Sequence, residues 1–380
     1  MLESFPRFHK SFQKVHEVIA FISDKNYMTT SKKLWFGCFM LGIVGCATMS
    51  AADRKNITFR YLNSNGIQMH VAEQGEGPLI ILCHGFPETW YSWRHQIPAL
   101  AEAGFHVVAP DQRGYGKTDK PHEIEAYNIF KLTGDIIGLV NALDKKEAII
   151  IGHDWGAPVA YYSSLLRPDI FKALVLLSVP YSPRPRGEGA VPPIQAAKTA
   201  GEANGTEFYQ VTFQDPSRTE EIFDQDPRSF LTSALIGASG DAPPDSQWNP
   251  WSSPGQRQAR TQSPVPSKLP DWLTEADLDF YTLQFEASGF RGGLNWYRNI
   301  DFNWLHTGFL MDAKILQPTL FIAGELDGVL KFRGDAYERL EEHVPRLSKK
   351  VIIPGEGHWI QQENPQEVNR LILEFLKELK

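Results

Sequence analysis

The stretch Ile149-Ile150-Ile151-Gly152-His153-Asp154-Trp155-Gly156-Ala157 decides the fold of this 380-residue chain. A short apolar run, typical of a buried strand, is followed by a tight turn centred on Asp154 and then by a helical pattern. Small residues stand two positions before and after Asp154, because a sharp turn brings backbone segments close together. A strand, a turn and a helix of this form make up the nucleophile elbow, G-x-Nu-x-G. Aspartate is also a favoured helix N-cap, which is the structural alternative for Asp154.

An aspartate at the centre of such a turn indicates a specific chemistry. Its carboxylate is ionised at neutral pH and needs no base to act as a nucleophile. It attacks a saturated carbon that bears a leaving group and so forms an ester with the protein. Hydrolysis of that ester then requires an activated water, and therefore a general base elsewhere in the chain.

The segments around this turn predict a mostly parallel, doubly wound α/β sheet. Residues 57–61 and 67–72 alternate in polarity and are joined by Asn63-Ser64-Asn65-Gly66, which predicts a hairpin. Short apolar runs that suit strands with both faces covered then alternate with helical periodicity. The predicted strands are 79–83, 106–109, 148–151, 173–177, 319–323 and 350–353. The predicted helices are 124–143, 157–166, 333–343 and 365–379.

The alternation stops between residues 181 and 316, a stretch rich in aromatic residues. We interpret 181–316 as a helical lid inserted into an α/β core of residues 55–180 and 317–380, over the strand ends where α/β ligand sites form. Its Gly/Pro/Ser/Gln-rich section, 237–270, is too long for an ordinary connection. We expect a partly ordered lid loop there, with plain disorder as the alternative.

Candidate partners for Asp154 lie in loops that follow other predicted strands. His358, in Gly355-Glu356-Gly357-His358-Trp359, is placed to act as the general base. Asp327 and Glu325 both qualify as the acid that orients the imidazole, and the order nucleophile, acid, histidine is that of the hydrolase fold. The turn His84-Gly85-Phe86-Pro87 predicts an oxyanion hole made by the amides of Phe86 and Trp155.

At these motifs the sequence resembles the α/β-hydrolase-fold epoxide hydrolases, close to the soluble type, over residues 57–379. The resemblance implies that Asp327 is the acid and that two lid tyrosines, Tyr297 and Tyr209, donate to the epoxide oxygen. The two tyrosines, together with Phe86 and Trp155, would also contact the substrate. The matching motifs are His84-Gly85-Phe86-Pro87, Asp111-Gln112-Arg113-Gly114-Tyr115-Gly116, Gly152-His153-Asp154-Trp155-Gly156, Phe208-Tyr209-Gln210-Val211-Thr212-Phe213-Gln214-Asp215-Pro216, Ser288-Gly289-Phe290-Arg291-Gly292, Leu294-Asn295-Trp296-Tyr297-Arg298-Asn299 and Gly357-His358-Trp359. The N-terminal segment and the loop 237–270 depart from the family pattern.

The resemblance implies conversion of a small apolar epoxide and water to a vicinal diol, without cofactor or metal. A haloalkane dehalogenase of the same fold is the nearest alternative, because it forms the same aspartyl ester. Such an enzyme needs donors for a departing halide, whereas this chain offers two phenols and carries Phe86 where dehalogenases often have asparagine. A non-catalytic, hydrolase-like ligand receptor is a further alternative, which the intact nucleophile, base and acid disfavour.

Composition excludes several other classes of function. With 38 basic and 45 acidic residues the net charge is −7, and no basic stripe suggests nucleic-acid binding. The three cysteines, Cys38, Cys46 and Cys83, predict neither a disulfide framework nor a zinc cluster.

The N-terminal segment, 1–54, resembles an export signal or membrane anchor. Lys32-Lys33 precede an apolar run, 34–45, that is shorter than the roughly 20 residues of a membrane span. Ile43-Val44-Gly45-Cys46 resembles a lipobox, and a start at Met28 would give the signal a short basic region. We expect an exported or anchored protein, with a hydrophobic tail on a cytoplasmic enzyme as the alternative.

Overall fold

The computed structural model describes residues 56–184, 187, 190–216, 218–244, 246–253 and 268–379. The predicted N-terminal segment, with Cys46, therefore lies outside the described residues, as do residues 245 and 254–267 of the predicted lid loop. Among the described helices, none combines the length and the apolar character that a membrane crossing needs.

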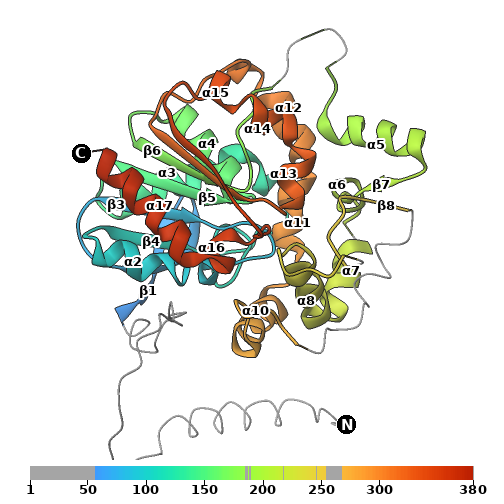
Figure 1. Ribbon diagram of the computed structural model, residues 1–380, viewed down its shortest axis with the longest axis horizontal. Helices are drawn as coiled ribbons and strands as arrows, with labels where there is room; N and C mark the ends of the chain where they lie inside the picture. The colour runs from blue at the N-terminus through green and yellow to red at the C-terminus, as the bar shows by residue number, and fades with distance from the viewer. Residues whose placement is uncertain are drawn as a thin grey trace, which may run out of the picture. The chain divides into compact units, whose positions relative to one another are not determined.

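An eight-stranded sheet in the order β1-β2-β4-β3-β5-β6-β9-β10 forms the centre of the fold (Figure 1). The pairs β1–β2 and β2–β4 are antiparallel, and every other neighbouring pair is parallel. The mostly parallel, doubly wound α/β sheet predicted from the sequence is thereby confirmed. The strands are β1 Thr58–Ser64, β2 Ile67–Gln74, β3 Leu79–Cys83, β4 His106–Pro110, β5 Ala148–His153, β6 Phe171–Leu177, β9 Thr319–Gly324 and β10 Leu347–Ile353.

The predicted hairpin is present, with a tighter turn than the four residues expected. Ser64 pairs with Ile67, so that only Asn65 and Gly66 form the connection. Both have positive φ angles, 49° and 80°, as a two-residue turn matched to the twist of the strands requires.

Two of the predicted helices are interrupted. The expected helix 124–143 is a 3₁₀ turn, η3 Ile124–Tyr127, followed by α3 Ile129–Ala142. The break lies at Asn128, whose backbone is extended and whose side chain accepts a hydrogen bond from the Lys131 amide as the N-cap of α3. The expected helix 333–343 is likewise divided into α14 Gly334–Glu338 and α15 Leu340–His343. The helices after β5 and at the C-terminus, α4 Gly156–Leu166 and α17 Pro365–Glu378, agree closely with the predictions.

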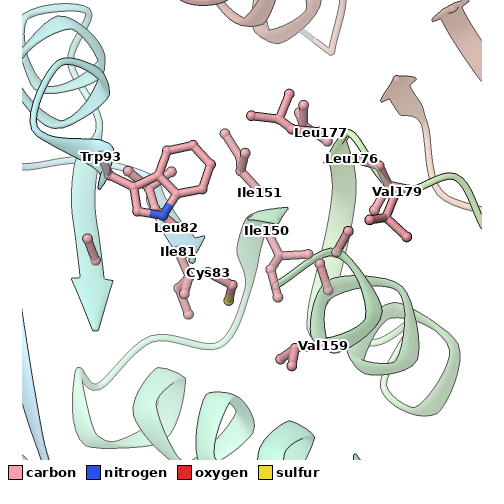
Figure 2. Packing of buried hydrophobic residues seen from close by; sticks show 14 of the residues in the cluster. Ile81, Leu82, Cys83, Trp93, Ile150, Ile151, Val159, Leu176, Leu177 and Val179 are labelled. Carbon is pink, nitrogen blue, oxygen red and sulfur yellow. The ribbon is translucent and has the colours of Figure 1, made fainter. Parts of the chain in front are cut away.

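The core lies between the central strands and the helices that cover them. Ile81 of β3, Ile150 of β5 and Leu176 of β6 have no exposed surface, and α4 contributes the equally buried Val159 (Figure 2). Because both faces of these strands are covered, their sequences are continuously apolar instead of alternating. The packing of β5 and α4 into this core thus holds the turn between them in place.

Between β6 and β9 the chain forms a mostly helical layer, which lies to the right of and below the sheet in Figure 1. It also contains a two-stranded antiparallel sheet that the sequence analysis missed, because each strand is only two residues long. The boundaries 55–180, 181–316 and 317–380 remain predictions. The elements of this layer are α5 Pro193–Asn204, β7 Glu207–Phe208, α6 Tyr209–Thr212, α7 Arg218–Gln225, α8 Pro227–Gly237, β8 Trp251–Ser252, α10 Glu275–Ser288, α11 Arg291–Arg298 and α12 Ile300–His306.

Candidate active site

Asp154 occupies the sharp turn between β5 and α4. Its φ angle is +49°, a left-handed conformation that is uncommon for a residue with a side chain. The flanking glycines allow the turn to pack: a Cβ atom on Gly156 would lie 1.9 Å from the Cys83 carbonyl oxygen, and one on Gly152 2.2 Å from the Gly156 oxygen. The strained turn and its packing are those of a nucleophile elbow, and Asp154 is 9% exposed.

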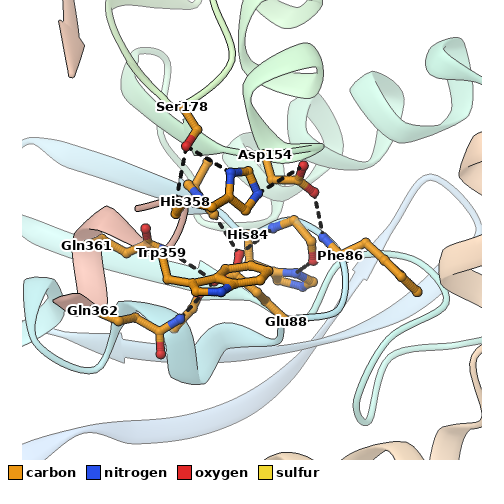
Figure 3. Close-up of polar contacts among 12 residues, drawn as sticks. His84, Phe86, Glu88, Asp154, Ser178, His358, Trp359, Gln361 and Gln362 are labelled. Atoms are coloured by element: carbon orange, nitrogen blue, oxygen red, sulfur yellow. Dashed lines mark hydrogen bonds and ion pairs between the residues drawn. The ribbon is translucent and has the colours of Figure 1, made fainter. Parts of the chain in front are cut away.

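The two carboxylate oxygens of Asp154 have different surroundings (Figure 3). The Phe86 amide donates a hydrogen bond of 2.8 Å to Oδ1, whereas Oδ2 lies 3.5 Å from His358 Nε2. Burial would raise the pKa of Asp154, but His358, the charge of His153 and the Phe86 amide together lower it below its usual value. Trp155, the other predicted amide donor, is the N-cap residue of α4 next to Asp154.

Of the two candidate acids, the structure brings Asp327 to His358. Asp327 Oδ1 lies 3.1 Å from His358 Nδ1, and the carboxylate is fully buried at the start of α13 Gly328–Phe332. Glu325 is exposed and accepts a hydrogen bond from the Gly355 amide instead. Asp327 is therefore the acid with the geometry to orient the imidazole.

His358 lies between two carboxylates, Asp327 at Nδ1 and Asp154 at Nε2. Burial lowers its pKa, but the charge of Asp327 and the hydrogen bonds with both carboxylates outweigh burial and raise the pKa well above its usual value. In the unreacted site the ring is thus readily protonated between two anions.

Ser178, at the end of β6, is a third contact of the imidazole that the sequence analysis did not identify. Its Oγ lies 3.1 Å from His358 Nδ1 (Figure 3). The same oxygen also contacts Asp327 Oδ2. The sequence offered one signal for it, because its position directly after a buried parallel strand puts it at the sheet edge where the other site residues lie.

A second histidine, His153, directly precedes Asp154 and connects two buried parts of the site. Its Nδ1 lies 2.8 Å from Glu88 Oε2 and its Nε2 lies 2.7 Å from the His358 carbonyl oxygen. Glu88 is fully buried, and its oxygens also accept hydrogen bonds from the Gly85 amide and from the side chains of Gln361 and Gln362. His153 thus connects the buried Glu88 carboxylate with the main chain at His358.

The two predicted lid tyrosines lie together opposite the elbow. Tyr297 of α11 and Tyr209 of α6 have ring centroids 5.9 Å apart, and Tyr297 also packs edge-on against Trp155 and Phe86. Burial and the charge of Asp154 raise the pKa of Tyr297 well above its usual value. Its phenol therefore keeps its proton and can donate a hydrogen bond.

Two cavities share Asp154 and Tyr209 in their linings. The narrower one has a volume of about 170 Å³ and also contains Tyr297 and His358, with apolar walls from the inserted layer such as Phe213. The wider one, about 660 Å³, is more polar and includes Trp155. Among the described residues no group of three His, Cys, Asp or Glu side chains could hold a metal ion.

Comparison with known proteins matches residues 78–365 to the alpha/beta hydrolase fold. Epoxide hydrolase A of Mycobacterium tuberculosis is 44% identical over 323 residues, which cover 84% of this chain and 97% of that protein. Epoxide hydrolase 3 of Siraitia grosvenorii is 40% identical, with 83% of this chain and 96% of that protein covered. Among solved structures, an epoxide hydrolase from an endophytic Streptomyces superposes with a TM-score of 0.79 at 43% identity, covering 86% of this chain and 96% of that one.

Proposed function

The chain belongs to the epoxide hydrolases of the α/β-hydrolase fold, and from this membership we propose how its own residues convert an epoxide into a vicinal diol. The observation that carries the proposal is the placement of Asp154: one carboxylate oxygen lies on the Phe86 amide, the other lies near His358, and both predicted phenols line the same cavity.

In the first half-reaction Asp154 attacks a ring carbon of the epoxide. Oδ2 is the attacking atom, because Oδ1 is already hydrogen-bonded to the Phe86 amide and becomes the carbonyl oxygen of the ester. The carbon–oxygen bond of the ring breaks as the new ester bond forms. The departing oxygen takes a proton from one of the phenols, Tyr209 or Tyr297, and the other phenol stabilises its charge by a hydrogen bond.

In the second half-reaction His358 removes a proton from water, which attacks the ester carbonyl. Asp327 stabilises the imidazolium, and the amides of Phe86 and Trp155 stabilise the tetrahedral oxyanion. Collapse releases the second oxygen of the diol, which takes its proton from His358, and leaves the second proton of the water on the Asp154 carboxyl group. That proton returns to the phenolate formed earlier, so that Asp154 is again a carboxylate and the tyrosine again a phenol.

The apolar walls of the narrower cavity favour a small apolar epoxide as the substrate. We expect the protein to form a diol from styrene oxide and to release no chloride from a haloalkane of similar size. Asp154→Ala should abolish diol formation while the fold is retained. Chloride release without diol formation would favour the dehalogenase alternative, and turnover of neither substrate by folded protein would contradict the proposal.

We further propose that the segment 1–54 directs export or membrane anchoring through Cys46. The support is its sequence pattern alone: Lys32-Lys33, the apolar run 34–45 and the lipobox-like residues before Cys46. The full-length protein should be recovered with membranes, and Cys46→Ser should move it into the soluble fraction. Recovery of both forms in the cytoplasm would contradict anchoring.

A further inference from the structure

We infer that Ser178 is a positioning residue for ester hydrolysis, which holds both His358 and Asp327; the inference rests on the proposed function. The three side chains lie in the segments that follow β6, β9 and β10, and each of them contacts the other two. His358 Nδ1 lies 3.1 Å from Asp327 Oδ1 and 3.1 Å from Ser178 Oγ, and Ser178 Oγ also contacts Asp327 Oδ2.

The proton of the Ser178 hydroxyl has one favoured acceptor. The closest of its polar contacts is Asp327 Oδ2, and the His358 carbonyl oxygen, at 3.1 Å, already accepts from His153 at 2.7 Å. The hydroxyl therefore donates to Asp327 and accepts from the Nδ1–H of His358. This arrangement fixes the tautomer that carries its proton on Nδ1, so that Nε2 is left as the base that faces Asp154.

Asp327 depends on the same hydroxyl for one of its two oxygens. The carboxylate is fully buried, and its Oδ1 is satisfied by the Val329 amide at 2.8 Å and by His358. Among the described residues, Ser178 is the hydrogen-bond donor to Oδ2. Without the hydroxyl, a buried carboxylate oxygen would lose its partner, which weakens the ionised form of Asp327 that stabilises the imidazolium.

The backbone of Ser178 is strained in the orientation that makes these contacts. Its φ angle is +69°, and the Val179 amide bonds to the Leu177 carbonyl at 2.8 Å across it, which defines a γ-turn with a left-handed central residue. The Ser178 amide is fixed to the Ile322 carbonyl at 2.9 Å. Glycine would be the relaxed choice for this turn, so a serine here costs conformational energy that a structural role alone does not require.

Two substitutions distinguish the effect of losing the hydroxyl from the effect of relaxing the backbone. Ser178→Gly removes the hydroxyl and relaxes the turn, whereas Ser178→Ala removes the hydroxyl and keeps the strain. The matched control is Ser163→Ala in α4, because the Ser163 hydroxyl is also buried but has no hydrogen-bond partner among the described residues. The two half-reactions are measured by single-turnover kinetics with styrene oxide, and the ester on Asp154 by mass spectrometry of the quenched protein.

We expect both Ser178 variants to hydrolyse the ester about tenfold to a hundredfold more slowly, the range of one hydrogen bond to a charged group, and to form it within about threefold of the normal rate. The ester should accumulate, and the downfield NMR signal of the His358 Nδ1 proton should shift. Ser163→Ala should change none of these. Unaltered hydrolysis in Ser178→Gly, or equal slowing of both half-reactions, would overturn the role of Ser178. Absence of any ester in the unmodified protein and in His358→Gln would overturn the proposed function instead.

Discussion

In the proposed mechanism, formation of the ester on Asp154 changes the pKa of His358, the general base. In the free site the charges and hydrogen bonds of Asp327 and Asp154 raise the pKa of His358 against the opposing effect of burial. Esterification neutralises Asp154, so one of the two anions is lost and the pKa of His358 falls. In the proposed mechanism the first half-reaction therefore favours the neutral imidazole that the activation of water requires.

The two half-reactions should separate as the pH falls. Ester formation needs ionised Asp154, whose pKa is lowered, and so persists in acid. Ester hydrolysis needs neutral His358 and should slow about tenfold per pH unit below the pKa that His358 has in the ester form. Single-turnover kinetics between about pH 8 and pH 5 should thus show the ester accumulating at the acid end. Loss of ester formation before loss of hydrolysis would contradict this order.

In the proposed mechanism the lid phenols stabilise the departing oxygen in the first half-reaction. Tyr297→Phe and Tyr209→Phe should each slow ester formation about tenfold to a hundredfold, because one of two donors to the epoxide oxygen is lost, and the double variant should lose it nearly completely. The control is Tyr115→Phe, since the Tyr115 hydroxyl is buried and makes no hydrogen bond to the described residues. Equal rates in the single variants and the control, measured by single-turnover kinetics, would remove both tyrosines from the mechanism.

At the scale of elements, the junction of β5 and α4 depends on close backbone packing against β3. Gly156→Ala would put a methyl group 1.9 Å from the Cys83 carbonyl, a backbone atom that cannot move by itself. We expect a loss of about 1–3 kcal/mol in the free energy of unfolding, measured by urea denaturation, together with lower activity. Gly334→Ala should be nearly neutral, because nothing lies within 4 Å of the added atom. Similar stability of both variants would contradict this account of the elbow.

Whether the sequence predicts an element depends on how that element is stabilised. The central parallel strands could be predicted because burial on both faces makes them largely apolar, whereas the edge strand β10, with sequence LSKKVII, was predicted only over its apolar end. The break at Asn128 was missed, since the periodicity of the apolar residues continues across it and only the side-chain cap marks the new start. The β7–β8 pair was missed because two-residue strands carry no periodic signal.

At the scale of the whole molecule, a series of buried hydrogen bonds links the inserted layer to His358, the proposed general base. Tyr281 of α10 donates to Gln362 at 3.0 Å, Gln362 donates to Glu88 at 3.0 Å, and Glu88 pairs with His153, which holds the His358 carbonyl. The main chain at His358 is thus held by a series of hydrogen bonds that begins on α10, a helix distant from His358 in the sequence.

Glu88→Gln should interrupt this chain. The Gly85 amide donates to one oxygen of Glu88 and the side chains of Gln361 and Gln362 donate to the other, so the amide nitrogen of glutamine would meet a donor on either side. We expect a loss of about 2–3 kcal/mol in unfolding free energy by urea denaturation, because a buried amide hydrogen would be left without an acceptor. Glu147→Gln, which breaks an exposed pair with Lys172, should change stability by less than about 1 kcal/mol. An equal effect of the two substitutions would argue against the buried pair.

The proposed reacting groups could be named from the sequence, whereas the residues that hold them in place could not. Asp154, His358 and the oxyanion turn lie in short motifs beside recognisable strands, and the two tyrosines follow from the family resemblance. Ser178 and Glu88 contact residues distant in sequence, at separations of 149 positions to Asp327 and 65 to His153. Such partners are set by the tertiary packing, which no local pattern records.

The covalent role of Asp154 is tested most directly by a single turnover in water labelled with ¹⁸O, with the enzyme in excess over styrene oxide. Because water attacks the ester carbonyl, we expect the label to enter the Asp154 carboxylate, where mass spectrometry of the peptide that contains Asp154 would detect it. The first diol molecules should carry unlabelled oxygen. Labelled diol from the first turnover, with an unlabelled Asp154 peptide, would show direct attack of water on the epoxide and contradict the account.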